Sequence, residues 1–176
     1  MPFQTSPRRD HGYDVSDYYN VDARFGTLGD FVEFTHGAEQ RGMRVLIDLV
    51  VNHTSDQHPW FQSARADADS PYRDWYVWAD EQPPDAEDGI VFPGVQKSTW
   101  SFDKKARRWY FHRFYDFQPD LNTAHPMVQA EILKIMGFWT PRRGGLPHGR
   151  GAVRHLAEGP RAEEVEARLR HAAQLP

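Results

Sequence analysis

The sequence predicts an α/β fold, and three features of its first 139 residues lead to that prediction. Apolar residues at helical spacing in segment 27–42 are followed directly by a continuous apolar run, 43–53. A second helical segment, 126–139, comes after a long irregular excursion. Runs rich in Val, Ile and Leu are typical of parallel strands that helices cover on both sides. Helix, strand and helix in this order indicate part of a βαβ arrangement with an insertion.

The first 26 residues are predicted to form a loop. Pro2, Pro7, Gly12 and Gly26 interrupt a stretch rich in Asp and Tyr that has no sustained helical period. No strand or helix is therefore expected before residue 27.

Segment 27–42 carries helix signals at both of its ends. Thr27 is a plausible N-cap, with Asp30 at the third helical position. Gly42 is expected to end the helix as a C′ glycine. The residues at helical spacing are Leu28, Phe31, Phe34, Thr35 and Ala38.

The run Met43–His53 places polar side chains at the end of a buried strand. In parallel α/β folds, functional groups gather beyond the carboxyl ends of the strands, where Asn52 and His53 lie. Asp48 lies inside the strand, and a buried carboxylate needs a cation or several donors. Two interpretations stay open here: a purely structural ion pair with a backbone-bonded histidine, or a functional strand end.

The excursion 54–119 is predicted to be an inserted subdomain, because it is too long for an ordinary connection between strand and helix. A short helical piece is expected around HPWFQSARA. The aromatic runs STWSFD and RRWYFHRFYDF, separated by DKKAR, favour a β-hairpin with a polar turn. The following helix has Pro126 early in its first turn and an apolar side, which consists of Met127, Ile132, Ile135 and Met136.

Composition and charge exclude several classes of function. The formal net charge is -4, from 21 Lys and Arg against 25 Asp and Glu, so no nucleic acid partner is expected. The absence of cysteine excludes disulfides and thiolate metal sites. No apolar run approaches the roughly 20 residues that span a bilayer, and the start lacks a signal-peptide core. The sequence therefore predicts a soluble, cytoplasmic protein with no membrane partner.

Zinc is the first metal to weigh, since the chain contains His53, His58 and His112. Their spacing matches no helical HExxH pattern, and no cysteine assists. A zinc site is therefore not favoured.

Four segments in this order resemble glycoside hydrolase family 13, the α-amylase superfamily: GYDVSDYYNVD, DLVVNHTSDQHPWFQ, YRDWYVW and HRFYDFQPDLN. Within it, SDQHPWFQSAR and FQPDLN are most similar to the trehalose synthases (maltose α-D-glucosyltransferases), followed by oligo-1,6-glucosidases and other α-glucosidases. The resemblance covers residues 6–139. It implies a partial (β/α)8 TIM barrel with an inserted, domain B-like α+β excursion. Residues 1–53 would form part of the barrel, 54–119 domain B and 120–139 a barrel helix, while 140–176 would be an irregular tail with one helix.

The resemblance also implies which residues bind substrate. The histidine at the position of His53 hydrogen-bonds the sugar in the -1 subsite, and those matching Asp10 and Tyr13 hold and stack against the same ring. Stacking suits the apolar C–H face of a sugar. Phe114 and Gln118 match positions that line the entrance of the pocket.

A structural calcium ion is the cofactor that the resemblance implies. Asn52 and Asp120 match residues that, in many family members, bind calcium and tie domain B to the barrel. Oxygen ligands suit this hard cation. A plain hydrogen-bond bridge without an ion is the alternative.

The implied activity is retaining chemistry on α-glucosidic bonds, with maltose and trehalose as substrates interconverted through a glucosyl-enzyme intermediate. Such chemistry needs two carboxyl groups about 5 Å apart. The family segments that carry the nucleophile and the acid do not occur after Trp139. The first barrel strand of the family is not found in this sequence either. The chain is therefore expected to be an inactive fragment of poor independent stability. An α-glucosidase or amylase-type hydrolase and a non-catalytic sugar-binding remnant remain as alternatives.

The tail suggests why these segments do not occur. All Trp, Tyr and Phe residues lie at or before Trp139. If a family-like GFRMDAVPFVI is written in GC-rich codons of our choice and read from its third base, it translates as LPHGRGAVRH, which is residues 146–155. We therefore hypothesise a frameshift near residue 140, and an unbroken genomic reading frame through this segment would exclude it. AEEVEARLRHAAQ is expected to be helical from its composition.

Overall fold

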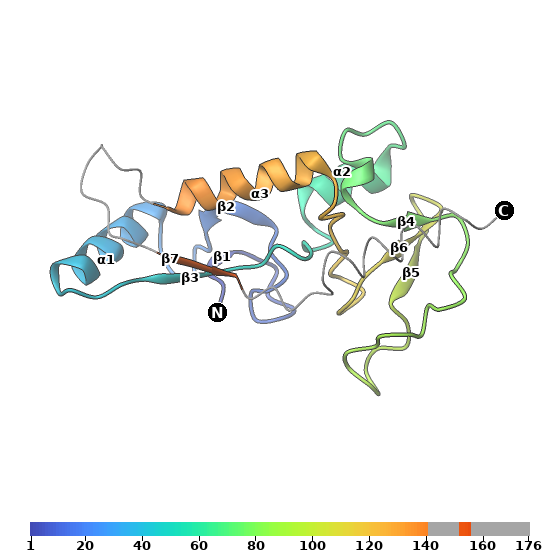
Figure 1. The fold of residues 1–176 in the computed structure, drawn as a ribbon, viewed down its shortest axis with the longest axis horizontal. Helices are drawn as coiled ribbons and strands as arrows, with labels where there is room; N and C mark the ends of the chain where they lie inside the picture. The colour runs from blue at the N-terminus through green and yellow to red at the C-terminus, as the bar shows by residue number, and fades with distance from the viewer. Residues whose placement is uncertain (141–151, 156–176) are drawn as a thin grey trace.

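The structure is a computed structural model that describes residues 1–140 and the strand at 152–155. Figure 1 shows α1 and the pair formed by β3 and β7 at one end of the molecule, a three-stranded sheet at the other, and α3 running between them. The elements in chain order are β1 (Gln4–Thr5), β2 (Asp17–Val21), α1 (Leu28–Gln40), β3 (Leu46–Leu49), α2 (Pro59–Ala66), the 3-10 turn η1 (Arg73–Trp75), β4 (Trp78–Ala79), β5 (Trp100–Asp103), β6 (Arg108–Phe111), α3 (Pro126–Trp139) and β7 (Ala152–His155).

Both ends of α1 form as the sequence predicts. The Asp30 amide donates to Thr27 Oγ1 at 3.2 Å, and the Thr27 amide donates to Asp30 Oδ2 at 2.6 Å. This reciprocal capping box satisfies two amides that the first helical turn leaves without a partner. Gly42 adopts a φ of 70° just after the C-cap, a conformation that glycine reaches without strain.

The loop predicted for residues 1–26 is wrong in part. β1 and β2 pair in antiparallel fashion, with Gln4 opposite Val21. β1 has only two residues, and the tight turns at Gly12 and Gly26 obscure the alternation in β2, where Tyr18 is buried and Tyr19 only partly so. A strand this short has no sequence period of its own.

β3 confirms the predicted parallel strand but corrects its length and its burial. It covers Leu46–Leu49 rather than Met43–His53, and it pairs in parallel with β7. Ile47 and Leu49 are buried, whereas Leu46 is 60 % exposed. One face of β3 therefore packs into a core, and the expectation of helices on both faces is wrong. That core joins β2, β3 and α3 and contains Val15, Tyr18, Ile47, Leu49, Ile135 and Trp139.

A second core belongs to the excursion. The predicted hairpin is present as β5 and β6, with Trp100 opposite Phe111, and β4 joins the other edge of β6. The predicted helical piece forms α2. Aromatic rings from α2, η1 and the sheet fill this core, which consists of Phe61, Ala64, Trp75, Tyr76, Tyr110, Leu121 and Val128.

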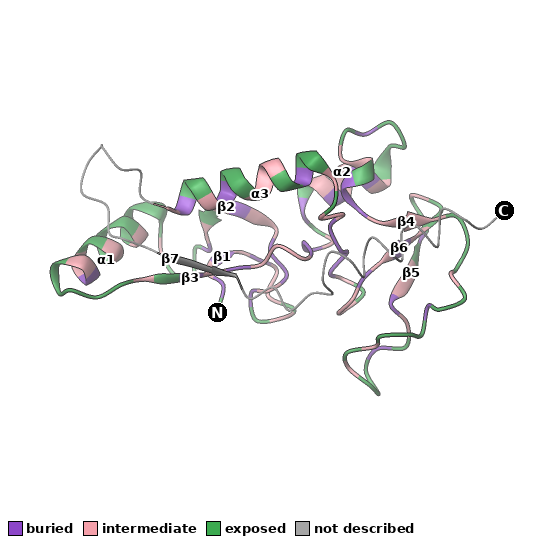
Figure 2. Ribbon diagram, in the orientation of Figure 1, coloured by how far each residue is buried: buried purple, intermediate pink, exposed green. Residues whose placement is uncertain are grey.

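Apolar residues remain on the outer faces of α1 and α3, where Figure 2 shows mostly exposed ribbon. Phe34 is 61 % exposed and Leu133 is 67 % exposed. Met127 is exposed as well, although it belongs to the apolar side that the sequence predicts for this helix. Ile135 does face the core, as predicted.

The tail contributes β7 beside β3, which the prediction of an irregular tail did not foresee. The helix expected in AEEVEARLRHAAQ lies outside the described residues. Within the described part of the chain, no helix is long and apolar enough to cross a membrane.

Two substitutions on α3 test which of its faces is covered. Leu133→Glu is expected to leave the melting temperature nearly unchanged and to reduce aggregation, because it replaces exposed apolar surface. Ile135→Glu, two residues further along the same helix, is expected to unfold the protein because it places an unpaired charge in a core. Circular dichroism melts and size-exclusion chromatography measure both effects. Equal destabilisation by the two variants would contradict this assignment of faces.

Candidate functional site

Three segments that are distant in sequence meet at one place: the loop 8–14, residues 52–56 after β3, and residues 113–121 that return from the excursion. The amide of Thr54 donates to Pro119 O at 3.1 Å, and the amide of Leu121 donates to Asn52 O at 2.8 Å. On the other side, the Ser55 amide donates to Val15 O at 2.8 Å. Backbone hydrogen bonds thus position the side chains that follow β3.

His53 is buried beside Tyr13 and Phe114. Its Nε2 lies 3.1 Å from the Tyr13 carbonyl oxygen, and its Nδ1 lies 3.3 Å from Asn52 Nδ2. The Phe114 ring meets it edge-on, with centroids 5.3 Å apart. Burial lowers the pKa of His53 to about 4, so the imidazole is neutral at neutral pH. The contacts fit an Nε2–H donor and an Nδ1 acceptor.

Asp10 and Gln118 bind each other although the whole excursion separates them in sequence. Gln118 Nε2 donates to Asp10 Oδ2 at 2.9 Å, and Gln118 Oε1 accepts the Tyr115 amide at 3.3 Å. Gln118 is fully buried. The structure therefore brings together four of the five predicted sugar-binding residues in two contacting pairs, His53 with Phe114 and Asp10 with Gln118.

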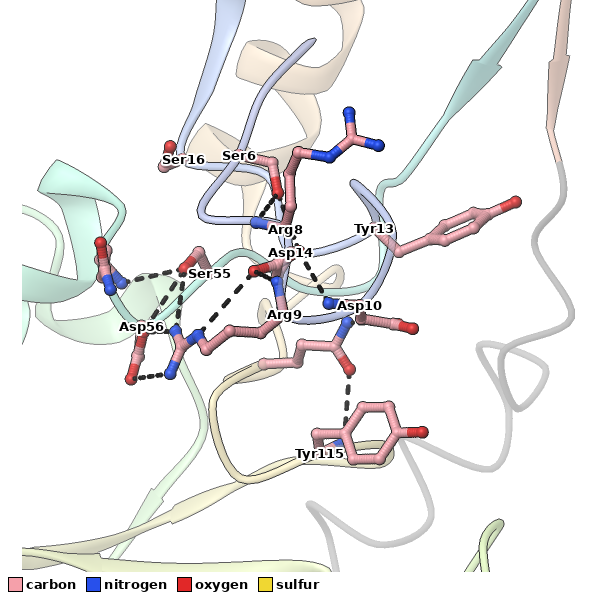
Figure 3. Close-up of polar contacts among 12 residues, drawn as sticks. Ser6, Arg8, Arg9, Asp10, Tyr13, Asp14, Ser16, Ser55, Asp56 and Tyr115 are labelled. Atoms are coloured by element: carbon pink, nitrogen blue, oxygen red, sulfur yellow. Dashed lines mark hydrogen bonds and ion pairs between the residues drawn. The ribbon is translucent and has the colours of Figure 1, made fainter. Parts of the chain in front are cut away.

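Tyr13 is the fifth predicted residue, and its ring points away from the polar cluster around Arg9 (Figure 3). Its hydroxyl donates to Asp48 Oδ2 at 3.0 Å. Burial, and then the hydrogen bond to the Asp48 carboxylate, raise the pKa of Tyr13. Asp48 also pairs with the N-terminal ammonium group at 3.6 Å. The sequence predicts a cation or several donors for Asp48, and the structure provides the ammonium group and the Tyr13 hydroxyl.

Asn52 and Asp120, the predicted calcium ligands, are in direct contact. Asn52 Nδ2 donates to Asp120 Oδ2 at 3.0 Å, and the Arg113 amide donates to Asp120 Oδ1 at 3.0 Å. Burial raises the pKa of Asp120 to about 7, although both hydrogen bonds act in the opposite direction. Among residues 1–140, no ion pair compensates this carboxylate.

The donor set alone does not complete a metal site. Calcium takes six to eight oxygen ligands, and the described residues contain no group of three or more His, Cys, Asp or Glu placed to hold a metal. The histidines considered for zinc have other partners. His58 Nδ1 accepts the Trp60 amide and caps α2, while His112 bonds Ser101 Oγ and the Phe114 carbonyl.

Sequence reasoning missed the charged cluster beside this site. Arg9 forms an ion pair with Asp56, and Asp14 is fully buried beneath the same loop. Figure 3 shows the Arg9 side chain extended toward Ser55 and Asp56. The Arg8–Arg9 pair matches no motif, so the sequence around Arg9 could not reveal partners more than forty positions away.

Comparison with known proteins identifies the family. The family model described as "Alpha amylase, catalytic domain" matches residues 1–146. The chain is 48 % identical over 138 residues to "Trehalose synthase/amylase TreS" of Mycobacterium tuberculosis, which covers 78 % of the chain and 23 % of that protein. It is 45 % identical over 141 residues to "Probable alpha-glucosidase" of Rhizobium meliloti, covering 80 % of the chain and 26 % of that protein.

Solved structures agree as well. Isomaltulose synthase from Klebsiella sp. LX3 superposes with a TM-score of 0.72 at 40 % identity, over 78 % of this chain and 25 % of that one. Trehalose-6-phosphate hydrolase of Bacillus licheniformis gives 0.71 at 38 % identity, over 78 % and 25 %. The chain thus spans about a quarter of the length of these relatives. Its predicted α/β fold is that of part of an α-amylase catalytic domain, and the chain belongs to the α-amylase family, glycoside hydrolase family 13.

Proposed function

We propose that this chain is the sugar-binding part of a catalytic domain that acts on α-glucosidic bonds. The reaction that we propose for this domain is the interconversion of maltose and trehalose. The observation that carries the proposal is the contact between Asp10 and Gln118 at 2.9 Å. It joins the loop before α1 to the segment that returns from the excursion, at the rim where His53 also lies. Polar groups that converge beyond the end of a parallel strand are the usual setting of a ligand site in such folds.

The finer architecture is part of the same proposal. β3 would be the third strand of a (β/α)8 barrel, α3 the helix after it, and residues 54–119 the inserted domain B. The packing of Ile47 and Leu49 against Ile135 and Trp139 of α3 supports the first assignment. The mostly aromatic second core supports the last, because five of its seven buried residues come from the excursion.

The site residues would divide the recognition of one glucose ring. Tyr13 would offer its ring face to the apolar C–H side of the sugar, and Asp10 would accept from hydroxyl groups. His53, neutral at neutral pH, would donate a hydrogen bond from Nε2 to a sugar oxygen. This bond would replace the present one to the Tyr13 carbonyl oxygen or share its proton with it. Phe114 and Gln118 would border the entrance. Cleavage needs two further carboxyl groups, which we do not place in residues 1–140.

A chimera tests the proposal. Residues 1–140 of this chain replace the matching segment of the M. tuberculosis relative, which then supplies the remaining part of the domain. The chimera is expected to convert maltose to trehalose, whereas the chain alone is expected to form neither trehalose nor glucose. A chimera that shows a native-like circular dichroism spectrum but no turnover would contradict the proposal.

A hydrolase is the second candidate, because the α-glucosidase of R. meliloti is nearly as similar as the trehalose synthase. The same residues placed in that host are expected to release glucose, so that the host would decide the product. A third possibility, a sugar-binding remnant, predicts something else: calorimetric binding of maltose by the chain alone.

We also propose that Asn52 and Asp120 supply two oxygen ligands of a calcium ion. The support is a buried carboxylate whose two hydrogen-bond donors are both neutral. Rotating the Asn52 amide by half a turn would present Oδ1 to a cation, and the orientation of an amide follows from its assumed partners. Backbone oxygens and water would complete the shell. The ion would supply positive charge that ties the excursion to the segment after β3.

Calcium is expected to stabilise the protein more at high pH than at low pH. Without the ion, the folded-state pKa of Asp120 is about 7, above its usual value, so its contribution to stability is present at low pH and is lost as the pH rises through 7. Calcium binds the ionised form and should reverse that loss. We expect calcium to raise the melting temperature over an EDTA control at about pH 8, more than at about pH 5.

Asp120→Asn is the control for this measurement. It keeps the shape of the side chain and removes its charge, so the response to calcium and its pH dependence should both disappear. A wild-type protein that melts identically in calcium and in EDTA at both pH values would leave the plain hydrogen-bond bridge as the correct description.

A further inference from the structure

Arg9 contacts all three segments of the site through one side chain. Its guanidinium pairs with both carboxylate oxygens of Asp56 and lies 3.4 Å from Ser55 Oγ, just after β3. The same group lies over the ring of Phe117, with Cζ 4.3 Å from the centroid. Bidentate pairing and stacking together use the planar shape of the guanidinium, which lysine lacks.

The loop end of Arg9 is held independently. Its backbone amide donates to Asp14 Oδ2 at 3.0 Å. The buried Asp14 also accepts the amide of Asp10 at 3.2 Å and the hydroxyl of Ser6 at 2.8 Å. The main chain at positions 9 and 10 is therefore fixed to one carboxylate. The Arg9 side chain connects this fixed loop to Ser55 and Asp56 (Figure 3) and to Phe117.

Arg9 and Phe117 are the sequence neighbours of Asp10 and Gln118. The contact between Arg9 and Phe117 thus lies next to the hydrogen bond between Asp10 and Gln118, and both join the same two segments. Phe117 is further held by Tyr115, whose ring stacks on it at 5.0 Å with an interplanar angle of 6°. Losing the contact between Arg9 and Phe117 would therefore disturb the Asp10–Gln118 hydrogen bond, because each of these residues is joined by one peptide bond to a residue of that pair.

We propose that Arg9 is a positioning residue: its clamp on Asp56 and Phe117 holds Asp10 and Gln118 together in the arrangement that receives the sugar. The proposal rests on the proposed function for the meaning of that arrangement, while the clamp itself is a property of this chain. Arg9 does not touch the sugar. It acts through the two residues that follow Arg9 and Phe117.

The side-chain amide signals of Gln118 report on the clamp directly. In the full chain labelled with 15N, the Gln118 NH2 protons should show separate, shifted resonances because one of them is bound to Asp10. In Arg9→Ala these resonances are expected to collapse toward free-amide positions. Hydrogen exchange of backbone amides in 10–14 and 115–118 should accelerate about tenfold, from the loss of a partly exposed ion pair and a cation–π contact.

Three further variants separate positioning from general stabilisation. Arg9→Lys keeps the charge and should recover less than half of the protection, since it lacks the planar fork. Asp56→Asn should cause a smaller change in the same direction, and it serves if Arg9→Ala fails to fold. Arg108→Ala removes an exposed ion pair to Asp80 that does not join these segments, and it should leave Gln118 unchanged.

The outcomes distinguish the clamp from the sugar site. Unchanged Gln118 signals in folded Arg9→Ala, or equal effects of Arg9→Ala and Arg108→Ala, would overturn the proposal. Full rescue by Arg9→Lys would do so too. A maltose titration of the 15N-labelled chimera addresses the other question. If Gln118 shows no response to maltose there, the sugar site is contradicted and the clamp stands as measured in the full chain.

Discussion

Replacing Phe61 with alanine is expected to destabilise the protein by about 3–5 kcal/mol, the range found for large aromatic-to-alanine changes in cores. Phe61 lies at the centre of the excursion core and is almost completely buried. Its ring contacts Tyr76, Trp78 and Tyr110, with centroids 5.0, 5.6 and 5.3 Å away. These partners come from two segments that are distant in sequence, 76–78 and β6, so the cavity could not collapse without moving the sheet. Folded domains are stabilised by only about 5–15 kcal/mol, and the loss would therefore be a large share.

Urea unfolding followed by tryptophan fluorescence measures this effect. Phe102→Ala is the matched control, because Phe102 lies on β5 in the same sheet but is about half exposed. It should shift the midpoint only slightly. If both substitutions lowered the free energy of unfolding equally, Phe61 would not be the centre of this core.

Replacing His53 with alanine in the chimera is expected to lower kcat/KM for maltose about 100-fold, the loss typical for one preorganised hydrogen-bond donor. His53 is neutral because burial lowers its pKa to about 4, so it acts as a donor throughout the neutral range. A donor that binds the sugar more strongly in the transition state than in the ground state should reduce kcat more than it raises KM.

His58→Asn is the control for this prediction. His58 is also buried, and its pKa is likewise lowered to about 4, but it caps α2. Asparagine is a good N-cap, so the variant should keep activity within about threefold. Equal losses in the two variants, both folded by circular dichroism, would remove the role assigned to His53.

Local signals explain the elements that the sequence predicted well. The capping box of Thr27 and Asp30 and the Gly42 that ends α1 involve residues within a few positions of each other. The β5–β6 hairpin has a short polar turn and aromatic strands, which also act over short range. The helix after Pro126 begins where proline fits best, although the capping ring of His125 carries no familiar signal.

Longer-range features account for the errors. The apolar run 43–53 looks like a strand buried on both faces, yet only the side of Ile47 and Leu49 meets a core. Hydropathy records that a residue is apolar but not whether another layer covers it. β1 was missed because its partner, β2, lies beyond the turn at Gly12 and neither strand has a strong period. The exposed position of Met127 has the same origin, since helical spacing does not specify the edge of a face.

The sequence by itself determined the family, the α/β class and the ends of α1, because motif order and short-range chemistry are written in neighbouring positions. The sugar-binding and calcium-binding residues remain predictions from the resemblance. Only the tertiary structure decided that Gln118 bonds Asp10, that Tyr13 bonds Asp48, and that Arg9 joins Asp56 to Phe117. It also decided that Asp120 is buried, which raises its pKa. These relations depend on how backbone hydrogen bonds close the chain around the excursion, and no local pattern encodes that closure.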